Sequence, residues 1–441
     1  MTFRDTGISM HIILISLFLI TYAAIAFEHP LKINKSASAL LGGGLMWTVF
    51  ALGSADPSAI SHDLSETLVS TAQIVFFLMG AMTIVEVVDT HKGFDVVTSR
   101  IKTTSLPRLL VLVSVVTFFL SAILDNLTTT IVMVSLLSKL LKDRQDRLFF
   151  AGLVVIAANS GGAWSPIGDV TTTMLWIGGQ ITSWSIIQSL FLPSVVNLLV
   201  PLVYCVWLLR GRLVVPPDAQ SGVSSHLMPT DKTSAFERNT MFFLGLGVLV
   251  AVPAFKTVTH LPPFVGVLLG LGLLWLVGDI LHKGKTDEER SKLQLSHALS
   301  RIDMSSIVFF IGILMAVATL EHTHILTELA QWLDNTVGRQ DVIVMLIGVF
   351  SAIVDNVPLV AASMGMYSIE TYPADSFLWT FLAYCAGTGG SILIIGSAAG
   401  VAAMGIEKID FVWYVKNISV LALAGYLAGA LVFIVQYQLG T

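Results

Sequence analysis

Three aspartates lie within strongly apolar stretches of the sequence: Asp125, Asp169 and Asp355. A carboxylate at the centre of a membrane-spanning helix costs roughly 2.5–3.5 kcal/mol on insertion scales, so such residues are rare and usually functional. Away from water the protonated acid is favoured, whereas a bound cation favours the carboxylate. One cluster of acids can therefore hold a cation and protons in turn, which is the chemistry of a cation/proton antiporter. The alternative is that these aspartates lie in surface loops.

Neutral oxygen donors accompany these acids. Hard cations such as Na⁺ prefer oxygen ligands, which hydroxyl, amide and carbonyl groups supply without further charge. The expected cation- or proton-binding residues are Asp125, Asn126, Thr128, Thr129, Asn159, Ser160, Asp169, Thr172, Asp355, Asn356, Thr388 and Ser391. Among them, Na⁺ is expected at Asp125, Asn126, Asp169 and Asp355. A single Thr or Ser can instead bond back to its own helix backbone.

The two halves of the chain are not equally rich in such donors. The threonine runs 128–130 and 171–173 have no counterparts in the second half, and Asp169 aligns with Ser397. The richer ion site is therefore expected in the first half.

Five further residues are weaker candidates for proton entry or pH sensing. Glu86 and Asp89 are three residues apart, on one face of a predicted helix, and Glu321 and His322 occupy a similar place in the second half. Solvated charge at the membrane interface is the alternative for these residues. Because histidine is the side chain suited to sensing pH near neutrality, His91 and His322 are candidate pH sensors, although exposed loop histidines are common.

The composition places these residues in a membrane. Of 441 residues, 55% are hydrophobic and 12% are charged, against about 25% charged in a soluble protein. The mean hydropathy is +0.82. The apolar segments are 8–27, 37–52, 68–88, 109–141, 148–178, 185–209, 241–255, 263–281, 305–320, 341–367, 377–404 and 411–435. This pattern predicts an all-α polytopic membrane protein.

The first apolar segment has two interpretations. Ala24–Ala26 resembles the small-residue cleavage site of a signal peptide. Lys32 and Lys35 follow the apolar run, and this arrangement favours a retained helix.

Two segments are too long for simple spans. Segment 109–141 would measure about 50 Å as one helix, against about 30 Å for the hydrocarbon core. It is interrupted at Asp125-Asn126, and segment 341–367 is interrupted at Asp355-Asn356. Both are predicted to be re-entrant hairpins. With the N-terminus outside, 19 lysines and arginines then face the cytoplasm and three the outside, whereas twelve crossings would give 9 and 13.

The halves also repeat each other. Residues 121–126 (SAILDN) recur as 351–356 (SAIVDN), and both Val-Phe-Phe and Gly-Gly recur in the same order. With each hairpin counted as no crossing, each repeat has five spans, an odd number, so the second repeat is inverted. The expected domains are a first repeat over 1–210, a cytoplasmic linker over 211–240 and a second repeat over 241–441. Gly161-Gly162 and Gly389-Gly390 are expected to interrupt a helix beside each hairpin.

Other classes of function lack support in the sequence. The net charge of −5 does not suggest a nucleic-acid partner. No Walker loop, dinucleotide fingerprint or metal-binding Cys/His spacing is present, so neither an enzyme nor a cofactor is expected. Cys205 and Cys385 both lie in apolar segments, which excludes a disulfide scaffold. A membrane-embedded enzyme or assembly subunit is a remote alternative, because no nucleophile–base pair is apparent.

Two motifs carry a family resemblance. Residues 121–130 (SAILDNLTTT) and 165–176 (SPIGDVTTTMLW) resemble those of NhaD-type sodium/proton antiporters, in the ion transporter superfamily. The resemblance runs from about residue 68 to the C-terminus. It implies an inverted-repeat fold with two hairpins, a homodimer and elevator-like alternating access in the bilayer. It also implies export of Na⁺, with Li⁺ as an alternative ion, against protons. The expected location is a bacterial cytoplasmic membrane, and the distribution of basic residues places both termini outside.

An anion carrier of the same superfamily is the main alternative, either a dicarboxylate/sodium symporter or an arsenite permease. The anion symporters have Ser-Asn-Thr at both hairpin tips. Here the matching places read Asp-Asn-Leu-Thr from Asp125 and Asp-Asn-Val-Pro from Asp355. Acids at both tips would repel an anion unless they were protonated or Na⁺-bound, so both motif and charge favour a cation.

Overall fold

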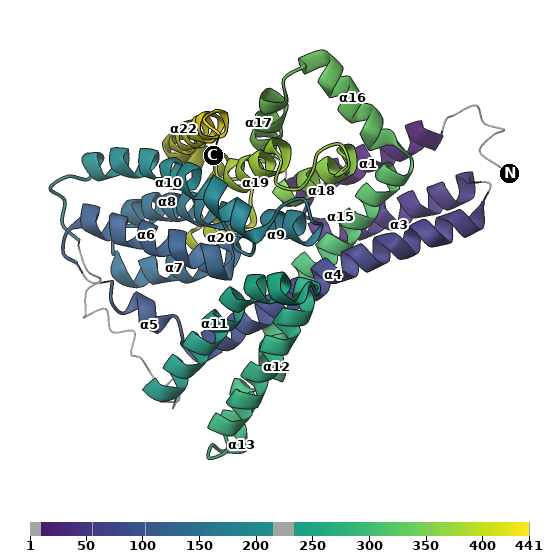
Figure 1. The fold of residues 1–441 in the computed structure, drawn as a ribbon. Helices are drawn as coiled ribbons and strands as arrows, with labels where there is room; N and C mark the ends of the chain where they lie inside the picture. Colours follow the sequence, from purple (N-terminus) through teal and green to yellow (C-terminus); the bar gives the residue numbers. More distant parts are fainter. Residues whose placement is uncertain (1–9, 55, 102, 215–232, 354, 441) are drawn as a thin grey trace.

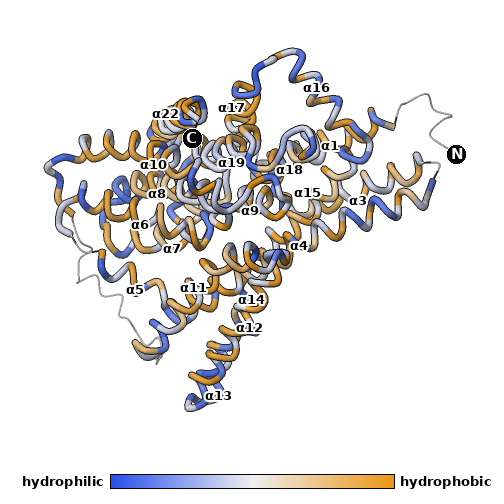
Figure 2. The backbone as a smooth tube through the Cα atoms, in the orientation of Figure 1, coloured by the Kyte–Doolittle hydropathy of each residue, from blue (hydrophilic) through white to orange (hydrophobic). Residues whose placement is uncertain are grey.

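The computed structural model describes residues 10–54, 56–101, 103–214, 233–353 and 355–440, and these form helices without a β-strand (Figure 1). Within these ranges, eight helices are long and apolar enough to cross a membrane. Apolar residues recur along the helices of the whole molecule (Figure 2). The predicted all-α membrane protein is confirmed. Most of the predicted linker over 211–240 lies outside the described residues.

The helices of the first half follow the predicted segments. They are α1 (Met10–Ala26), α2 (Glu28–Leu31), α3 (Lys35–Gly53), α4 (Pro57–Thr90), α5 (Asp95–Thr98), α6 (Leu106–Leu124), α7 (Asn126–Leu140), α8 (Arg144–Ala163), α9 (Val170–Ile177) and α10 (Ser183–Leu208). Helix α4 begins eleven residues before its predicted segment, because the Asp56 carboxylate caps its first turn by accepting from the Ser58 and Ala59 amides.

The described residues of the second half also fold into helices. Its helices are α11 (Ala235–Thr259), α12 (Pro263–Leu281), α13 (Asp287–Leu293), α14 (Leu295–Arg301), α15 (Met304–His322), α16 (Ile325–Val337), α17 (Gln340–Phe350), α18 (Asn356–Met366), α19 (Phe377–Gly389), α20 (Ala398–Glu407), α21 (Phe411–Tyr414) and α22 (Val420–Gln438). A π-helical turn, Val415–Ser419, joins the last two. Helix α16 was not predicted.

The first predicted hairpin is a helical hairpin whose two ends meet. The chain breaks at Asp125, between α6 and α7. At the start of α6, the Leu106 amide donates to the Arg212 carbonyl (3.1 Å). The Arg212 guanidinium in turn pairs with Asp146, directly after the hairpin (2.9 Å). Both ends of the hairpin therefore lie beside the end of α10, as a re-entrant element requires. Its depth in a membrane stays a prediction.

The helices pack as two bodies (Figure 1). The peripheral body consists of α1, α3, α4, α11, α12 and α15, in which α3 packs on α1 and α15, and α4 on α12 and α15. The hairpin body consists of α6–α10, α17–α20 and α22, in which α8 packs on both arms of the first hairpin and α10 packs along α22. The bodies meet where α18 contacts α15 and where α9 contacts α4.

Matched glycines support the internal repeat. A Cβ atom at Gly161 in α8 would overlap the Phe118 carbonyl oxygen in α6. A Cβ atom at Gly389 in α19 would likewise overlap the Gly348 carbonyl oxygen in α17. In each half, a glycine of the interrupted helix therefore lets the first arm of the neighbouring hairpin approach closely. The inverted orientation of the halves stays a prediction.

Candidate functional site

Asp125 forms the tip of the first hairpin in an unusual backbone conformation. Its φ is 106° and its ψ is 160°, a region that is essentially restricted to glycine. The carboxylate accepts hydrogen bonds from the Thr128 amide (2.8 Å) and the Thr128 hydroxyl (2.9 Å). It therefore caps the N-terminus of α7, where the helix dipole favours negative charge.

Asp169 occupies the matching position on the interrupted helix. It caps α9 by accepting from the Thr171 amide (2.9 Å) and hydroxyl (2.7 Å), and it is 2% exposed. The buried Asn126 amide donates to the Asp169 carboxylate and to the Asn159 side-chain oxygen (3.0 Å). The residue beside Asp125 thus joins the hairpin tip to the break in the neighbouring helix.

Asn159 carries this network into the second half of the chain. Its side-chain amide donates to the hydroxyls of Ser391 (2.8 Å) and Ser397 (2.9 Å). Ser397 caps α20 by accepting from the Gly400 amide (3.2 Å), as Asp169 caps α9. This equivalence agrees with the sequence alignment of Asp169 with Ser397. Buried polar side chains from both halves therefore form one continuous network.

A small cavity of about 70 Å³ lies against the first tip, between the two bodies. Its lining includes Asp125 and Asn126 from the hairpin, and Phe77 and Phe310 from α4 and α15. The two phenylalanines end the repeated Val-Phe-Phe motifs. One turn into α7, the Thr129 hydroxyl is buried without a hydrogen-bond partner among the described residues. Such an oxygen is an available cation ligand.

The other predicted donors divide into two groups. The Thr172 hydroxyl donates to the Asp169 carbonyl (2.9 Å) and so belongs to the cap of α9. The hydroxyls of Ser160 and Thr388 donate to carbonyls one turn back in their own helices. These two residues make the ordinary helix bond that was the alternative for any single hydroxyl. Asn197, which sequence analysis missed, donates to Ser160; its signal was an amide within an apolar segment.

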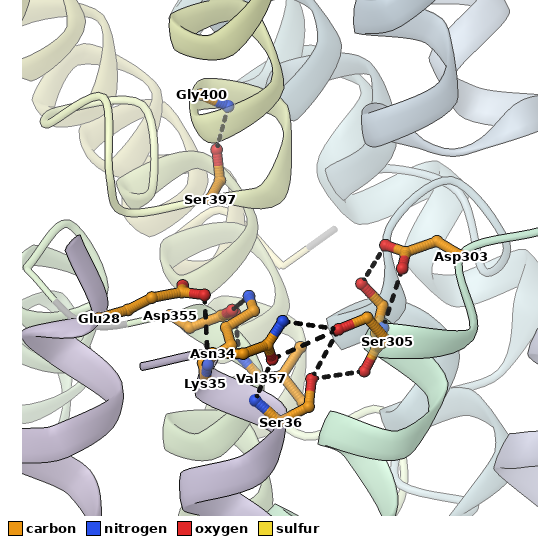
Figure 3. Close-up of polar contacts among 11 residues, drawn as sticks. Glu28, Asn34, Lys35, Ser36, Asp303, Ser305, Asp355, Val357, Ser397 and Gly400 are labelled. Atoms are coloured by element: carbon orange, nitrogen blue, oxygen red, sulfur yellow. Dashed lines mark hydrogen bonds and ion pairs between the residues drawn. The ribbon is translucent and has the colours of Figure 1, made fainter. Parts of the chain in front are cut away.

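Asp355, at the second tip, has a cationic partner, whereas Asp125 has none among the described residues. Asp355 caps α18 through the Val357 amide (3.4 Å), and its other oxygen lies 2.8 Å from the Lys35 ammonium (Figure 3). Lys35 is one of the 19 basic residues that the sequence analysis expected on the cytoplasmic side, and the sequence did not assign it to the site. Asn356 is buried beside this pair. The role of Asp355 as a Na⁺ ligand stays a prediction.

The three aspartates interact without converging. Asp169 lies close enough to both Asp125 and Asp355 for electrostatic repulsion. Among the described residues, however, no three histidine, cysteine or acidic side chains are grouped as a metal cluster would be. Any cation bound here must therefore take ligands from the neutral donors as well as from carboxylates.

The candidates at the end of α4 are mostly paired. Glu86 forms an ion pair with Arg301 (2.9 Å), while Asp89 is exposed. His91 is fully buried and stacks on His282, with 3.1 Å between their Nε2 atoms. The alternative of an exposed loop histidine is wrong for His91. Burial lowers the pKa of both rings, that of His282 to about 4.

Glu321 and His322 are the last two residues of α15. The His322 ring contacts the Thr67 hydroxyl of α4 (3.1 Å), and Glu321 is exposed. Neither residue belongs to the network around Asp125 and Asp169. Their role in proton entry stays a prediction.

Comparisons with known proteins identify the family of the chain. A family model described as citrate transporter matches residues 22–387. The chain is 50% identical to "Sodium/proton antiporter 1" of Arabidopsis thaliana over 96% of this chain and 72% of that protein. It is 46% identical to "Sodium/proton antiporter 2" of the same plant over 96% and 99%, and 31% identical to "Na(+)/H(+) antiporter NhaD" of Vibrio parahaemolyticus over 86% and 94%. The chain is therefore an integral membrane transporter and not an enzyme, and it belongs to the NhaD-type sodium/proton antiporter family.

Proposed function

We propose that the protein exchanges Na⁺ for protons across a membrane, with Li⁺ as an alternative cation. The observation that carries the proposal is the contact of Asn126 with Asp169 at the meeting of the hairpin tip and the broken helix. Among the described residues, neither Asp125 nor Asp169 forms an ion pair with a cationic side chain. Their hydrogen-bond partners are the neutral groups of Thr128, Thr171 and Asn126.

This environment gives each carboxylate hydrogen bonds from neutral groups but, among the described residues, no cationic partner. A buried ion without a partner is costly, so each acid needs either a cation or a proton. Na⁺ binding requires the ionised acids and displaces their protons, and proton binding displaces Na⁺. Thr129 and Asn159 offer further oxygen atoms to the ion. Competition for the same carboxylates then produces exchange.

Alternating access requires the ion site to face each side in turn. The cavity beside Asp125 lies between the hairpin body and the peripheral body. We propose that the hairpin body moves relative to the peripheral body and carries the bound cation with it. A homodimer, as the resemblance implies, would anchor the peripheral bodies. Because the relatives come from a plant and from bacteria, the expected bacterial cytoplasmic membrane stays a prediction.

Anion transport is the second candidate, favoured by the description of the family model as citrate transporter. An anion would have to approach the carboxylates of Asp125 and Asp169, whose hydrogen bonds already use the nearest donors. Repulsion between like charges in a buried site opposes this function.

The test uses proteoliposomes that contain a pH-sensitive dye and an imposed pH gradient. We expect Na⁺ to dissipate the gradient and citrate to leave it unchanged. Asp125→Asn and Asp169→Asn should abolish the Na⁺ response, since neither variant can bind a proton and a cation in turn. Asp56→Asn is the matched control, because Asp56 also caps a helix but is exposed. Undiminished exchange in both buried-site variants would contradict the site, and a response to citrate alone would favour the anion carrier.

A further inference from the structure

Hydrogen bonds at the start of α3 hold Lys35 in a position from which its side chain reaches the second hairpin. The Asn34 side chain accepts from the Ser36 amide (2.8 Å), and the Ser36 hydroxyl contacts the Ser305 carbonyl at the start of α15 (2.7 Å) (Figure 3). The Lys35 amide donates to the Glu28 carboxylate (3.2 Å). These contacts hold the backbone of Lys35 in the peripheral body, while its ammonium reaches the hairpin body at Asp355 (2.8 Å).

The ammonium has a second partner within reach. Lys35 Nζ lies 4.6 Å from the centre of the Phe309 ring, which is a cation–π distance. Phe309 is in the repeated Val-Phe-Phe motif of α15, so it belongs to the same body as Lys35. A lysine that leaves Asp355 can therefore remain over this ring without being fully solvated.

A cavity with a largely apolar lining borders the pair. Its volume is about 450 Å³, and its lining includes Lys35, Asp355, Glu28 and Ser397. The lining thus combines two carboxylates with the hydroxyl that Asn159 also contacts. The cavity therefore has enough space and enough oxygen ligands for a cation to replace the ammonium at Asp355.

We propose that Lys35 is a built-in competitor of Na⁺ for Asp355. In the conformation seen here its ammonium takes the place of a cation at the second tip. Na⁺ binds Asp355 only when Lys35 moves away, and Lys35 returns when Na⁺ leaves. Because the pair joins the two bodies, its separation also releases the hairpin body to move. This inference rests on the proposed function and adds to it the residue that sets the affinity for Na⁺.

The other charged groups around the pair are compatible with this role. Glu28 and Asp303 lie on the Lys35 side, and the Tyr22 hydroxyl and Asp169 lie near Asp355. None of these neighbours is a cation. Among the described residues, Lys35 is thus the positive charge within this group of acidic side chains.

The test is the apparent KM for Na⁺ in proteoliposomes, measured at one alkaline pH. Lys35→Met removes the competitor, so KM should fall by a factor of about three or more, because a larger fraction of molecules has Asp355 free. Lys35→Arg should raise KM by a factor of about three or more, since a guanidinium forms two hydrogen bonds with a carboxylate and so binds Asp355 more tightly. A residue with a merely structural role would move KM in the same direction in both variants.

Controls separate this inference from the proposed function. Lys32→Met, at an exposed lysine three residues earlier, should leave KM unchanged. If Lys35→Met does not transport, the Na⁺ concentration that gives half-maximal thermal stabilisation in detergent replaces KM and should fall in the same way. Unchanged values in both Lys35 variants, or shifts in one direction, would overturn the competition. Wild-type protein without Na⁺-dependent proton movement would instead refute the proposed function.

Discussion

At the tip of the first hairpin, Asp125 combines a half-buried carboxylate with a backbone conformation that glycine adopts more readily. Such a conformation costs of order 1–3 kcal/mol for other residues and persists where the surrounding structure enforces it. Here the strained turn directs the carboxylate onto the first turn of α7 and sets Asn126 against Asp169. The conformation of Asp125 therefore lowers the stability of the fold but places the carboxylate where it can bind a cation or a proton.

The strain can be measured by comparing two substitutions at this position. Asp125→Gly and Asp125→Ala both lack the charge and the cap, so they differ in backbone freedom alone. We expect the glycine variant to be more stable than the alanine variant by about 1 kcal/mol or more, because φ is positive. Thermal unfolding in detergent measures this, and an alanine variant of equal or greater stability would contradict the strain.

The stacked pair of His91 and His282 predicts how stability depends on pH. The pKa of His282 falls from its ordinary value of 6.5 to about 4, through burial and the neighbouring His91. The unfolded chain therefore takes up a proton at a higher pH than the folded chain does, so folding is favoured above 6.5 and loses stability as the pH falls toward 4. His282→Phe keeps a ring but does not titrate.

We therefore expect the midpoint of thermal unfolding to fall with acid in the wild type and to fall less in His282→Phe. Substituting the exposed His62 with Phe should preserve the wild-type slope. Identical slopes in wild type and His282→Phe would show that the pair does not carry this pH dependence.

At the scale of helices, the sequence predicted the helix breaks well, because each break places polar or glycine residues within a continuous apolar run. The Asp-Asn pair marked the end of α6, because it interrupts an apolar stretch that is too long for one span. The two Gly-Gly pairs marked the ends of α8 and α19. Helix α16 was missed because its apolar residues lie on one face and its polar residues on the other, so no continuous apolar run marks it. The pair of Lys35 with Asp355 was missed because it joins residues 320 positions apart, and no local pattern encodes such a contact.

The matched glycines predict a packing requirement of the hairpins. Gly161→Ala and Gly389→Ala each place a methyl group against a backbone carbonyl that cannot rotate away. Overpacking of this kind costs typically about 1–3 kcal/mol, and we expect both variants to be destabilised and to exchange Na⁺ more slowly.

Gly247 and Gly272 provide the controls, because a Cβ atom there meets no other atom within 4 Å. Alanine at these positions should leave stability unchanged or raise it slightly, since alanine favours a helix. Thermal unfolding of the four variants is the measurement. Equal stability of Gly161→Ala and Gly247→Ala would contradict the close approach.

For the whole molecule, the predicted topology rests on the hairpins returning to their side of entry. With both hairpins re-entrant and the N-terminus outside, exposed Lys283 faces the cytoplasm and exposed Arg339 the outside. If all twelve segments crossed, these two positions would exchange sides. Cys205 and Cys385 are both buried, so the wild-type chain provides a low background for thiol labelling.

We expect a membrane-impermeant maleimide to label Arg339→Cys in intact cells and Lys283→Cys only after permeabilisation. The wild-type chain is the control for background labelling. The opposite pattern of labelling would contradict a topology with the N-terminus outside and a re-entrant first hairpin.

The central claim is that the carboxylates of Asp125 and Asp169 hold Na⁺ and protons in turn, and proton release on Na⁺ binding tests it most directly. Purified protein in weakly buffered detergent, with a pH indicator, should release protons when NaCl is added and none when choline chloride is added. The double variant Asp125→Asn/Asp169→Asn should release none with either salt. Na⁺ binding without proton release in the wild type, or undiminished release in the double variant, would contradict the account.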